Sequence, residues 1–209
     1  MAGRLIYLMG PSGSGKDTIL LGLSRLMGQQ AYIAPRVITR PVTHTEPHAV
    51  SASAADFEQI ERNGGFAMSW RANGLAYGVR WSDIAERLLA GDDVFVNGSR
   101  EYLPEARRRY RMLVPILLVV DDATLQQRLV ARGREDADRI RQRMSRNVTY
   151  AGLAASAPLG DVLAIDNSGS PEDTIKALYE YLHTRHTSER HGHATDTSGY
   201  RQRQATARL

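Results

Sequence analysis

Residues 10–18 read GPSGSGKDT, directly after the short apolar run RLIYLM. A phosphate-binding loop follows the pattern G-x-x-x-x-G-K, then Ser or Thr, and lies between a strand and a helix. Gly10, Gly15 and Lys16 fit this pattern, and the flanking sequence predicts the strand and the helix. Position 17 is Asp, although a hydroxyl at that place normally helps to hold Mg²⁺. The stretch therefore predicts a nucleotide-binding α/β domain with an altered metal site.

The backbone N–H groups of this loop and the N-terminus of the following helix are expected to bind the phosphates of ATP. Lys16 is expected to reach the β- and γ-phosphates and to act in catalysis. A glycine-rich turn without a ligand is the alternative, but it does not account for the strand, glycines, lysine and helix together. The predicted nucleotide-binding residues of the loop are Gly10, Pro11, Ser12, Gly13, Ser14, Gly15, Lys16, Asp17 and Thr18.

Asp17 is open to two interpretations. A carboxylate is a hard ligand for Mg²⁺, and we favour a contact with the metal, directly or through water. Alternatively, Asp17 only stabilises the first turn of the helix, where negative charge is favourable. Thr18 carries a hydroxyl one residue later, which points it away from the usual position. The predicted cofactors are thus ATP and Mg²⁺.

Predicted strands and helices alternate along the chain, which is typical of an α/β domain with a central parallel sheet flanked by helices. We expect Ser53, Ser82 and Ser170 to cap helix N-termini, and Gly28 and Gly91 to end helices. Strands are predicted at 4–9, 32–39, 66–70, 75–79, 93–97, 112–120 and 162–165. Helices are predicted at 16–27, 54–62, between Ser82 and Gly91, at 102–110 and 125–131, in an Arg-rich stretch ending near 155, and after Ser170.

A hairpin signal at Asn73-Gly74 interrupts this alternation. It predicts a small inserted lobe, at about 36–80, that binds the substrate. From about 187 to 209 the sequence is polar and irregular, which predicts a disordered tail.

The composition excludes several classes of protein. The chain has 209 residues, of which 42% are hydrophobic and 24% charged, as in ordinary globular proteins. It contains no apolar run of about 18 residues, so no membrane-spanning helix or membrane partner is predicted. Because there is no cysteine, disulfides, thiol nucleophiles and thiolate metal sites are excluded. This composition suits the cytoplasm, where we expect the protein to reside.

The net charge of +4 comes almost entirely from arginine, since Lys16 and Lys176 are the only lysines. A basic chain can bind nucleic acid, and Arg107, Arg108 and Arg109 are the best support for that function. They lie before an apolar strand, without interleaved aromatic residues or a known binding motif, so no nucleic-acid partner is predicted.

Arginines crowd the segment around 131–140 and the helix expected after it. An ion-paired, solvated helix is the ordinary interpretation of such a run, since acidic residues lie among the arginines. Beside a phosphate loop we favour a lid that closes over the site, brings positive charge to the transferred phosphoryl group and excludes water. The arginines of this segment are Arg128, Arg132, Arg134, Arg139, Arg143 and Arg146.

These residues together resemble the guanylate kinase family of nucleoside monophosphate kinases, over about 4–185. GPSGSGK is similar to its phosphate loop, Thr39-Arg40-Pro41 to its T-R-x-P segment and Tyr77-Gly78 to its Y-G pair. The resemblance implies a P-loop kinase domain over 1–186, in which Arg40 and Tyr77 bind the acceptor phosphate. It also implies catalytic roles for Arg132, Arg134 and Arg143, and nucleotide contacts for Arg128 and Asn167, although a plain turn explains Asn167 equally well.

The departures from that family are informative. Met68 and Val79 stand where the family has the Glu and Thr that read guanine, and the segment 96–100, VNGSR, replaces an acidic strand end. Together with GKD in the loop and RGRE in the lid, these residues resemble the ribose 1,5-bisphosphate phosphokinases, a branch of the same fold. This resemblance implies that ATP and ribose 1,5-bisphosphate give ADP and 5-phospho-α-D-ribose 1-diphosphate (PRPP), in phosphonate catabolism. A nucleoside monophosphate kinase is the alternative, and a non-catalytic binding module a remote one.

The acceptor implied by this resemblance is a small sugar phosphate. Its attacking 1-phosphate oxygen is ionised at neutral pH, so no general base is expected, but its two phosphates require several arginines. Arg36, Arg80 and His48 are further candidate phosphate contacts, and Asn97 contacts either a sugar hydroxyl or metal-bound water. Monomer and homodimer remain equally open. The predicted substrate-binding residues are Arg40, Tyr77, Asn97, Ser99 and Arg100.

Overall fold

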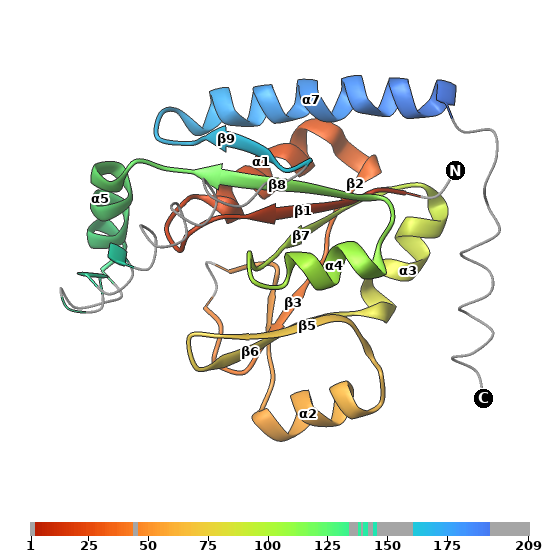
Figure 1. The fold of residues 1–209 in the computed structure, drawn as a ribbon. Coiled ribbons are helices and arrows are strands. Elements are labelled where there is room, and N and C mark those ends of the chain that lie inside the picture. The colour runs from red at the N-terminus through yellow and green to blue at the C-terminus, as the bar shows by residue number, and fades with distance from the viewer. Residues whose placement is uncertain are drawn as a thin grey trace.

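The computed structural model describes residues 3–43, 46–133, 138, 140–141, 144–145 and 161–192, and only the backbone from 185 onward. Two sheets form its frame, with helices packed around them (Figure 1). The predicted α/β architecture with a central parallel sheet is confirmed.

The first sheet has five parallel strands in the order β2-β7-β1-β8-β9. They span Ala31–Ile33 (β2), Asp93–Asn97 (β7), Leu5–Met9 (β1), Leu113–Val119 (β8) and Leu163–Asp166 (β9). All five residues of β1 are buried, because helices or the second sheet cover both faces of this sheet. This burial on both faces explains why β1 is an unbroken apolar run in the sequence.

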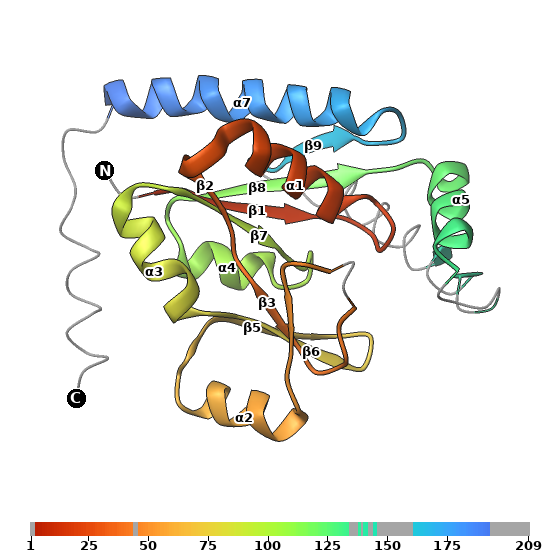
Figure 2. The same ribbon diagram turned by 180° about the vertical axis from the view of Figure 1, so that it is seen from behind.

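Helices cover both faces of this sheet (Figures 1 and 2). On one face α1 (Lys16–Met27) and α7 (Pro171–Gly192) pack against Ile6 and Leu8 of β1. On the other face α3 (Trp81–Ala90) and α4 (Leu103–Arg109) pack against Tyr7 and its neighbours. At the carboxyl ends of the strands lies α5 (Asp122–Arg132).

The predicted inserted lobe is a second sheet with the order β4-β3-β6-β5. Its strands span Ala49–Ser51 (β4), Arg36–Ile38 (β3), Leu75–Arg80 (β6) and Phe66–Ala72 (β5), and α2 (Ala54–Arg62) covers its outer face. The β5–β6 hairpin turns at Asn73 and Gly74 with φ of 54° and 74°, the left-handed conformations that the Asn-Gly pair favours.

One predicted strand is divided in the structure. The run at 32–39 does not form a single strand: β2 belongs to the first sheet and β3 to the second. Pro35 lies between them and has no N–H to donate to a ladder, so pairing stops there. The chain therefore passes from one sheet to the other at this proline.

Helix termini follow the sequence closely, with exceptions. Ser53 caps α2 by accepting a hydrogen bond from Asp56 N at 3.1 Å, and Ser170 accepts from Glu172 N at 3.2 Å ahead of α7. Ser82 was wrong as a cap: α3 begins at Trp81, whose N–H donates to Gly65 O at 3.0 Å. A backbone carbonyl thus replaces the side-chain cap.

The boundary predicted for the tail also needs correction, because α7 continues to Gly192. On α1, Leu26 is 52% exposed although its side chain is apolar. The short 3-10 helix η1 (Gly28–Gln30) follows α1 and was not predicted. The remainder of the predicted tail, and most of the predicted Arg-rich helix after α5, lie outside the described residues.

Candidate active site

The predicted phosphate loop lies at the carboxyl end of β1, between that strand and α1. Its glycines adopt backbone conformations that other residues rarely take, with φ of 91° at Gly13 and 88° at Gly15. A Cβ atom on Gly13 would lie 3.0 Å from Leu129 and 3.2 Å from Leu125 of α5. The loop therefore passes directly beneath α5, and both the positive φ and this close packing favour glycine at position 13.

Lys16 folds back across its own loop. Its Nζ donates hydrogen bonds to Gly10 O and Pro11 O, both at 2.9 Å. Burial lowers the pKa of Lys16 to about 7, opposed by the Asp17 carboxylate. The positive charges of Arg36, Arg100 and Arg132 lower this pKa further. Lys16 is thus surrounded by more positive than negative charge, as expected of a site for polyanionic phosphates.

Asp17 is held by a residue from a distant part of the chain. Asn97, at the end of β7, donates from Nδ2 to Asp17 Oδ1 at 2.7 Å. Asn97 is 8% exposed, and its own Oδ1 is buried without a partner in the described residues. Sequence analysis named both residues but did not foresee that they touch. The contact exists because β1 and β7 are parallel neighbours that end at the same edge of the sheet.

These two residues fit a magnesium ion. A carboxylate oxygen and an amide oxygen are the hard ligands that Mg²⁺ prefers, and Mg²⁺ in kinases needs only one or two carboxylates besides the phosphates. Across the described residues, no group of three or more His, Cys, Asp or Glu side chains could hold a metal alone. A magnesium ion here would therefore rest on Asp17 together with the nucleotide.

Tyr7 anchors the segment after β7, and sequence analysis missed it. Its hydroxyl donates to Ser99 O and accepts from Ser99 N, both at 2.9 Å. A Cβ atom on Gly98 would lie 2.1 Å from the Tyr7 ring, so only glycine fits against it. Burial raises the pKa of the Tyr7 hydroxyl. A tyrosine inside the apolar run of β1 was the available signal, because a buried hydroxyl requires a partner.

Two of the predicted acceptor residues have partners within the lobe. Arg40 pairs with Glu46 through both guanidinium nitrogens, at 3.0 and 2.7 Å. Tyr77 stacks on Trp70, with 5.7 Å between ring centroids and 8° between planes. Tyr77 thus has a fixed ring, whereas the positive charge of Arg40 is already matched by a carboxylate.

Two other arginines bring positive charge close to the loop. Arg36 lies over the Tyr77 ring, with its guanidinium carbon 5.6 Å from the centroid. Burial lowers the pKa of Arg36 and that of Arg100. Arg80, a further candidate, occupies the N-cap position of α3 and is partly exposed.

The two residues predicted on the nucleotide side both lie close to Gly15 of the phosphate loop. Asn167 is 1% exposed and donates from Nδ2 to Ser14 O at 2.7 Å, which fixes the loop to the end of β9. Arg128 of α5 donates weakly to Gly169 O at 3.4 Å, and one of its terminal nitrogens is buried without a partner in the described residues. Asn167 therefore supports the loop, while its contact with a nucleotide remains a prediction, as does that of Arg128.

The predicted lid is described only in part. Arg132 ends α5, is exposed, and its charge acts on Lys16. Ile140 is 7% exposed and packs against Leu125 and Leu129 of α5. Arg134 and Arg143 lie outside the described residues, so their catalytic roles remain predictions.

Comparison with known proteins identifies the family. A scan against models of protein families found no match. Ribose 1,5-bisphosphate phosphokinase PhnN of Pseudomonas paraeruginosa (strain DSM 24068 / PA7) is 48% identical over 184 residues, 87% of this chain and 96% of that protein. The chain belongs to the PhnN family. The resemblance to ribose 1,5-bisphosphate phosphokinases drawn from the sequence is thereby confirmed.

Other PhnN proteins extend this match. Those of Pseudomonas fluorescens (strain SBW25) and Yersinia pestis are 43% and 42% identical, covering 90% and 86% of this chain and 99% and 91% of those proteins. A guanylate kinase crystal structure from Anaplasma phagocytophilum superposes with a TM-score of 0.66 at 16% identity, covering 88% of this chain and 86% of that one. This PhnN protein thus has the guanylate kinase fold.

Two positions separate this PhnN protein from the guanine-reading pattern. Met68 is fully buried and Val79 is 1% exposed, and both belong to the main core cluster together with Trp70. Their apolar side chains pack against the first sheet, at the two positions where the guanylate kinase family is expected to have Glu and Thr for reading guanine. These positions therefore contribute to the core of the lobe rather than offering polar groups to a base.

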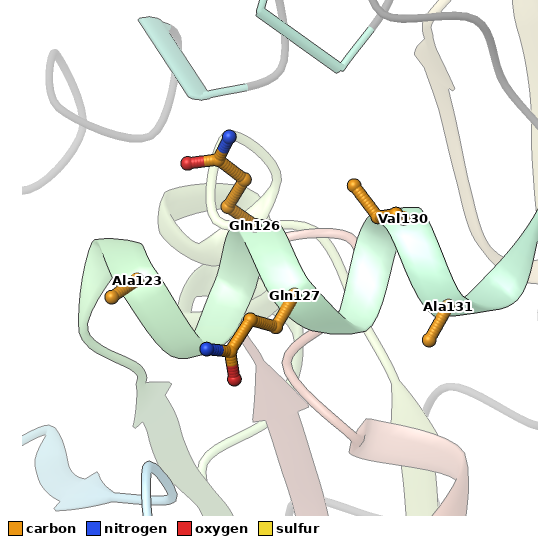
Figure 3. Close-up of a pocket in the computed structure, with 5 residues that line it drawn as sticks. All are labelled: Ala123, Gln126, Gln127, Val130 and Ala131. Atoms are coloured by element: carbon orange, nitrogen blue, oxygen red, sulfur yellow. The ribbon is translucent and has the colours of Figure 1, made fainter.

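A hollow on the outer face of α5 lies apart from this site (Figure 3). Alanine, glutamine and valine side chains line it, without a titratable group, whereas Leu125 and Leu129 on the opposite face of α5 contact the loop. It offers neither charge nor a nucleophile. Its lining residues are Ala123, Gln126, Gln127, Val130 and Ala131.

Proposed function

We propose that this chain is an ATP-dependent kinase that transfers the γ-phosphoryl group of ATP to the 1-phosphate of ribose 1,5-bisphosphate. The products are ADP and 5-phospho-α-D-ribose 1-diphosphate (PRPP). We propose that the reaction acts in phosphonate catabolism and supplies the cell with PRPP. The observation that carries this proposal is the identity of 42–48%, over most of both chains, to proteins named ribose 1,5-bisphosphate phosphokinase. The phosphate loop with Lys16 folded into it supports the same conclusion.

In this reaction an oxygen of the acceptor 1-phosphate forms a bond to the γ-phosphorus. The bond between that phosphorus and the β–γ bridging oxygen breaks, and ADP leaves with the electron pair. The attacking oxygen is already ionised at neutral pH, so no side chain has to remove a proton. The protein must instead offset the repulsion between two anions, which is the role of Lys16 and the arginines around it.

Magnesium, when bound, would neutralise charge on the β- and γ-phosphates. We propose that Asp17 holds this ion, directly or through water, and that Asn97 keeps the carboxylate in place through its 2.7 Å hydrogen bond. The buried Oδ1 of Asn97 would accept a hydrogen bond from metal-bound water or from a sugar hydroxyl.

The remaining site residues take their proposed roles from position. Arg132, with Arg134 and Arg143 of the lid, would stabilise charge on the transferred group. Ser99 and Arg100 follow β7, at the edge of the sheet where the loop lies, and would bind the acceptor.

A small sugar phosphate is therefore the proposed partner, with no role for nucleic acid or a membrane. Among the described residues, no helix has the length and apolarity needed to cross a bilayer. Because the reaction consumes ATP, we propose that the protein works in the cytoplasm.

A nucleoside monophosphate kinase has the same fold, so the acceptor decides the function. The test measures ADP release from ATP with ribose 1,5-bisphosphate, with GMP, and without an acceptor. We expect turnover with the sugar bisphosphate to exceed turnover with GMP by at least about 100-fold, since the guanine-reading polar groups are absent. Faster turnover with GMP would refute the proposal. No turnover with either acceptor would indicate a binding module.

A further inference from the structure

We propose that Arg36, at the start of β3, is the side chain that binds the attacking 1-phosphate of the acceptor, and that Arg40 is not its principal ligand. This inference rests on the proposed function, because it names the group that holds its nucleophile. It reverses the emphasis drawn from the T-R-x-P resemblance, in which Arg40 has that role.

The first support is the position of Arg36 on the second sheet. Tyr77 on β6 is the partner of Ile38 on β3 and of Trp70 on β5, so these side chains form a row on one face. Arg36 is two residues before Ile38 and therefore lies on the same face. The Tyr77 ring on β6 therefore contacts side chains from both neighbouring strands. Trp70 of β5 stacks on it, and the guanidinium carbon of Arg36 on β3 lies 5.6 Å from its centroid.

The second support is that the Arg36 side chain is partly buried and forms no ion pair with a carboxylate in the described residues. Its Nε is buried and makes no hydrogen bond to the described residues. A buried charge without a partner is costly, and proteins retain such groups where a ligand completes the pairing. Burial lowers the pKa of Arg36 in this state, which shows the same imbalance.

Arg40 provides the contrast. Both of its terminal nitrogens contact Glu46, at 3.0 and 2.7 Å, so a phosphate would have to displace a bidentate carboxylate. Arg36 offers a planar guanidinium with no such competitor. A phosphate would therefore gain more from Arg36 than from Arg40.

The third support is that the charge of Arg36 acts on residues of the phosphate loop. Arg36 lowers the pKa of Lys16, and Asp17 is the first of the charged groups that raise the pKa of Arg36. Arg36 begins β3, just after the chain crosses from the first sheet into the second (Figure 2), and its charge acts on Lys16 of the phosphate loop. A phosphate bound there would be next to the γ-phosphate, as in-line transfer requires.

The experiment compares Arg36→Gln and Arg36→Lys with the matched variant Arg40→Gln. Binding of ribose 1,5-bisphosphate without ATP is followed by tryptophan fluorescence, since Trp70 stacks on Tyr77 beside Arg36. The only other tryptophan, Trp81, is replaced by Phe in every protein. ATP affinity is measured separately, and circular dichroism verifies folding.

We expect Arg36→Gln to weaken binding of the sugar bisphosphate about 10- to 100-fold, as for loss of a charge-assisted bidentate contact. ATP affinity should change less than about twofold, and Arg36→Lys should restore part of the loss. Arg40→Gln should weaken binding less than Arg36→Gln does. If Arg36→Gln fails to fold, Arg36→Lys against Arg40→Lys decides by the same order.

A larger loss in the Arg40 variant, or an equal loss of ATP affinity in the Arg36 variant, would overturn the inference. The proposed function fails in a different way: wild-type protein would then bind and phosphorylate GMP in preference to the sugar bisphosphate. In that event the same variants, measured with GMP, still determine whether Arg36 or Arg40 holds the acceptor phosphate.

Discussion

The phosphate loop and the proposed acceptor lobe would bind the same chemical group in different ways. The loop uses consecutive residues: glycine backbone and one lysine bound to the carbonyls of Gly10 and Pro11. The acceptor side collects side chains from separate elements, with Arg36 on β3, Tyr77 on β6 and Arg100 after β7. A contiguous backbone site is therefore visible in the sequence, whereas a site assembled from side chains depends on which partners the fold provides.

The largest effect expected is the loss of Lys16. Lys16→Ala should lower kcat/KM about 10³-fold, because a charge that stabilises the transferred phosphoryl group is removed. The free energy of unfolding without ligand should not fall, since burial of this charged group already lowers its pKa to about 7. Steady-state kinetics and urea unfolding measure the two quantities.

Lys176, the other lysine of the chain, is exposed on α7 and provides the matched control. Lys176→Ala should leave both quantities unchanged. Similar losses of activity in the two variants would contradict the special role given to the loop.

A second prediction separates structural from functional arginines. Arg4 and Asp93 form a buried pair, at 2.9 and 2.6 Å, and Arg4 also donates to Leu182 O at 2.8 Å. Removing one member leaves a buried charge, so Asp93→Ala should cost about 3–5 kcal/mol in the free energy of unfolding. Urea unfolding should give less than about 1 kcal/mol for Asp92→Ala, whose pair with Arg87 is partly exposed.

Equal losses from the neighbouring variants Asp92→Ala and Asp93→Ala would show that burial does not govern these pairs. The argument that the partly buried Arg36 lacks a carboxylate partner because it binds a ligand would then lose its basis.

A third prediction concerns metal at the boundary between the two regions. Asp17→Ala should reduce activity at saturating ATP about 10- to 100-fold and raise the Mg²⁺ concentration needed for half-maximal rate, because a ligand of the ion is lost. The melting temperature should fall only modestly, because Asp17 is exposed but Asn97 loses the acceptor of its 2.7 Å hydrogen bond. Magnesium titrations of activity, with melting curves, measure both effects.

Asn97→Ala should show a weaker form of the same defect, because it frees the carboxylate without removing it. An unchanged magnesium requirement in Asp17→Ala would mean that this residue only stabilises the start of α1.

The smallest effect expected is the pH dependence of ATP binding. The pKa of Lys16 in the free protein is about 7, and bound phosphates should raise it, so ATP binds the protonated form. Affinity should then fall about fivefold from pH 7 to pH 8, with proton uptake on binding. Calorimetry in buffers of different ionisation enthalpy measures that uptake. Proton release, or affinity that increases with pH, would contradict this account.

Local patterns predicted much of the fold. The bounds of α1 agree with the prediction, and the Asn73-Gly74 turn and the Ser53 cap are confirmed, because short-range chemistry determines each of them. The division of 32–39 into β2 and β3 was missed, since membership of different sheets depends on long-range pairing.

The site residues show the same division between local and long-range contacts. The loop residues could be read directly, whereas the bond from Asn97 to Asp17 and the pairing of Arg40 with Glu46 join residues that no local pattern connects. Tyr7 was overlooked because its hydroxyl finds its partner, Ser99, only through the parallel pairing of β1 with β7.

The most direct test of the central claim follows the transferred phosphoryl group. ATP labelled in its γ-phosphoryl group is incubated with the protein, Mg²⁺ and ribose 1,5-bisphosphate, and the products are identified by ³¹P NMR. We predict that the label appears in the outer phosphoryl group of a new diphosphate at C1 of the sugar, while the 5-phosphate remains a monoester. Label found only in inorganic phosphate, or in GDP when GMP is added at equal concentration, would contradict the account.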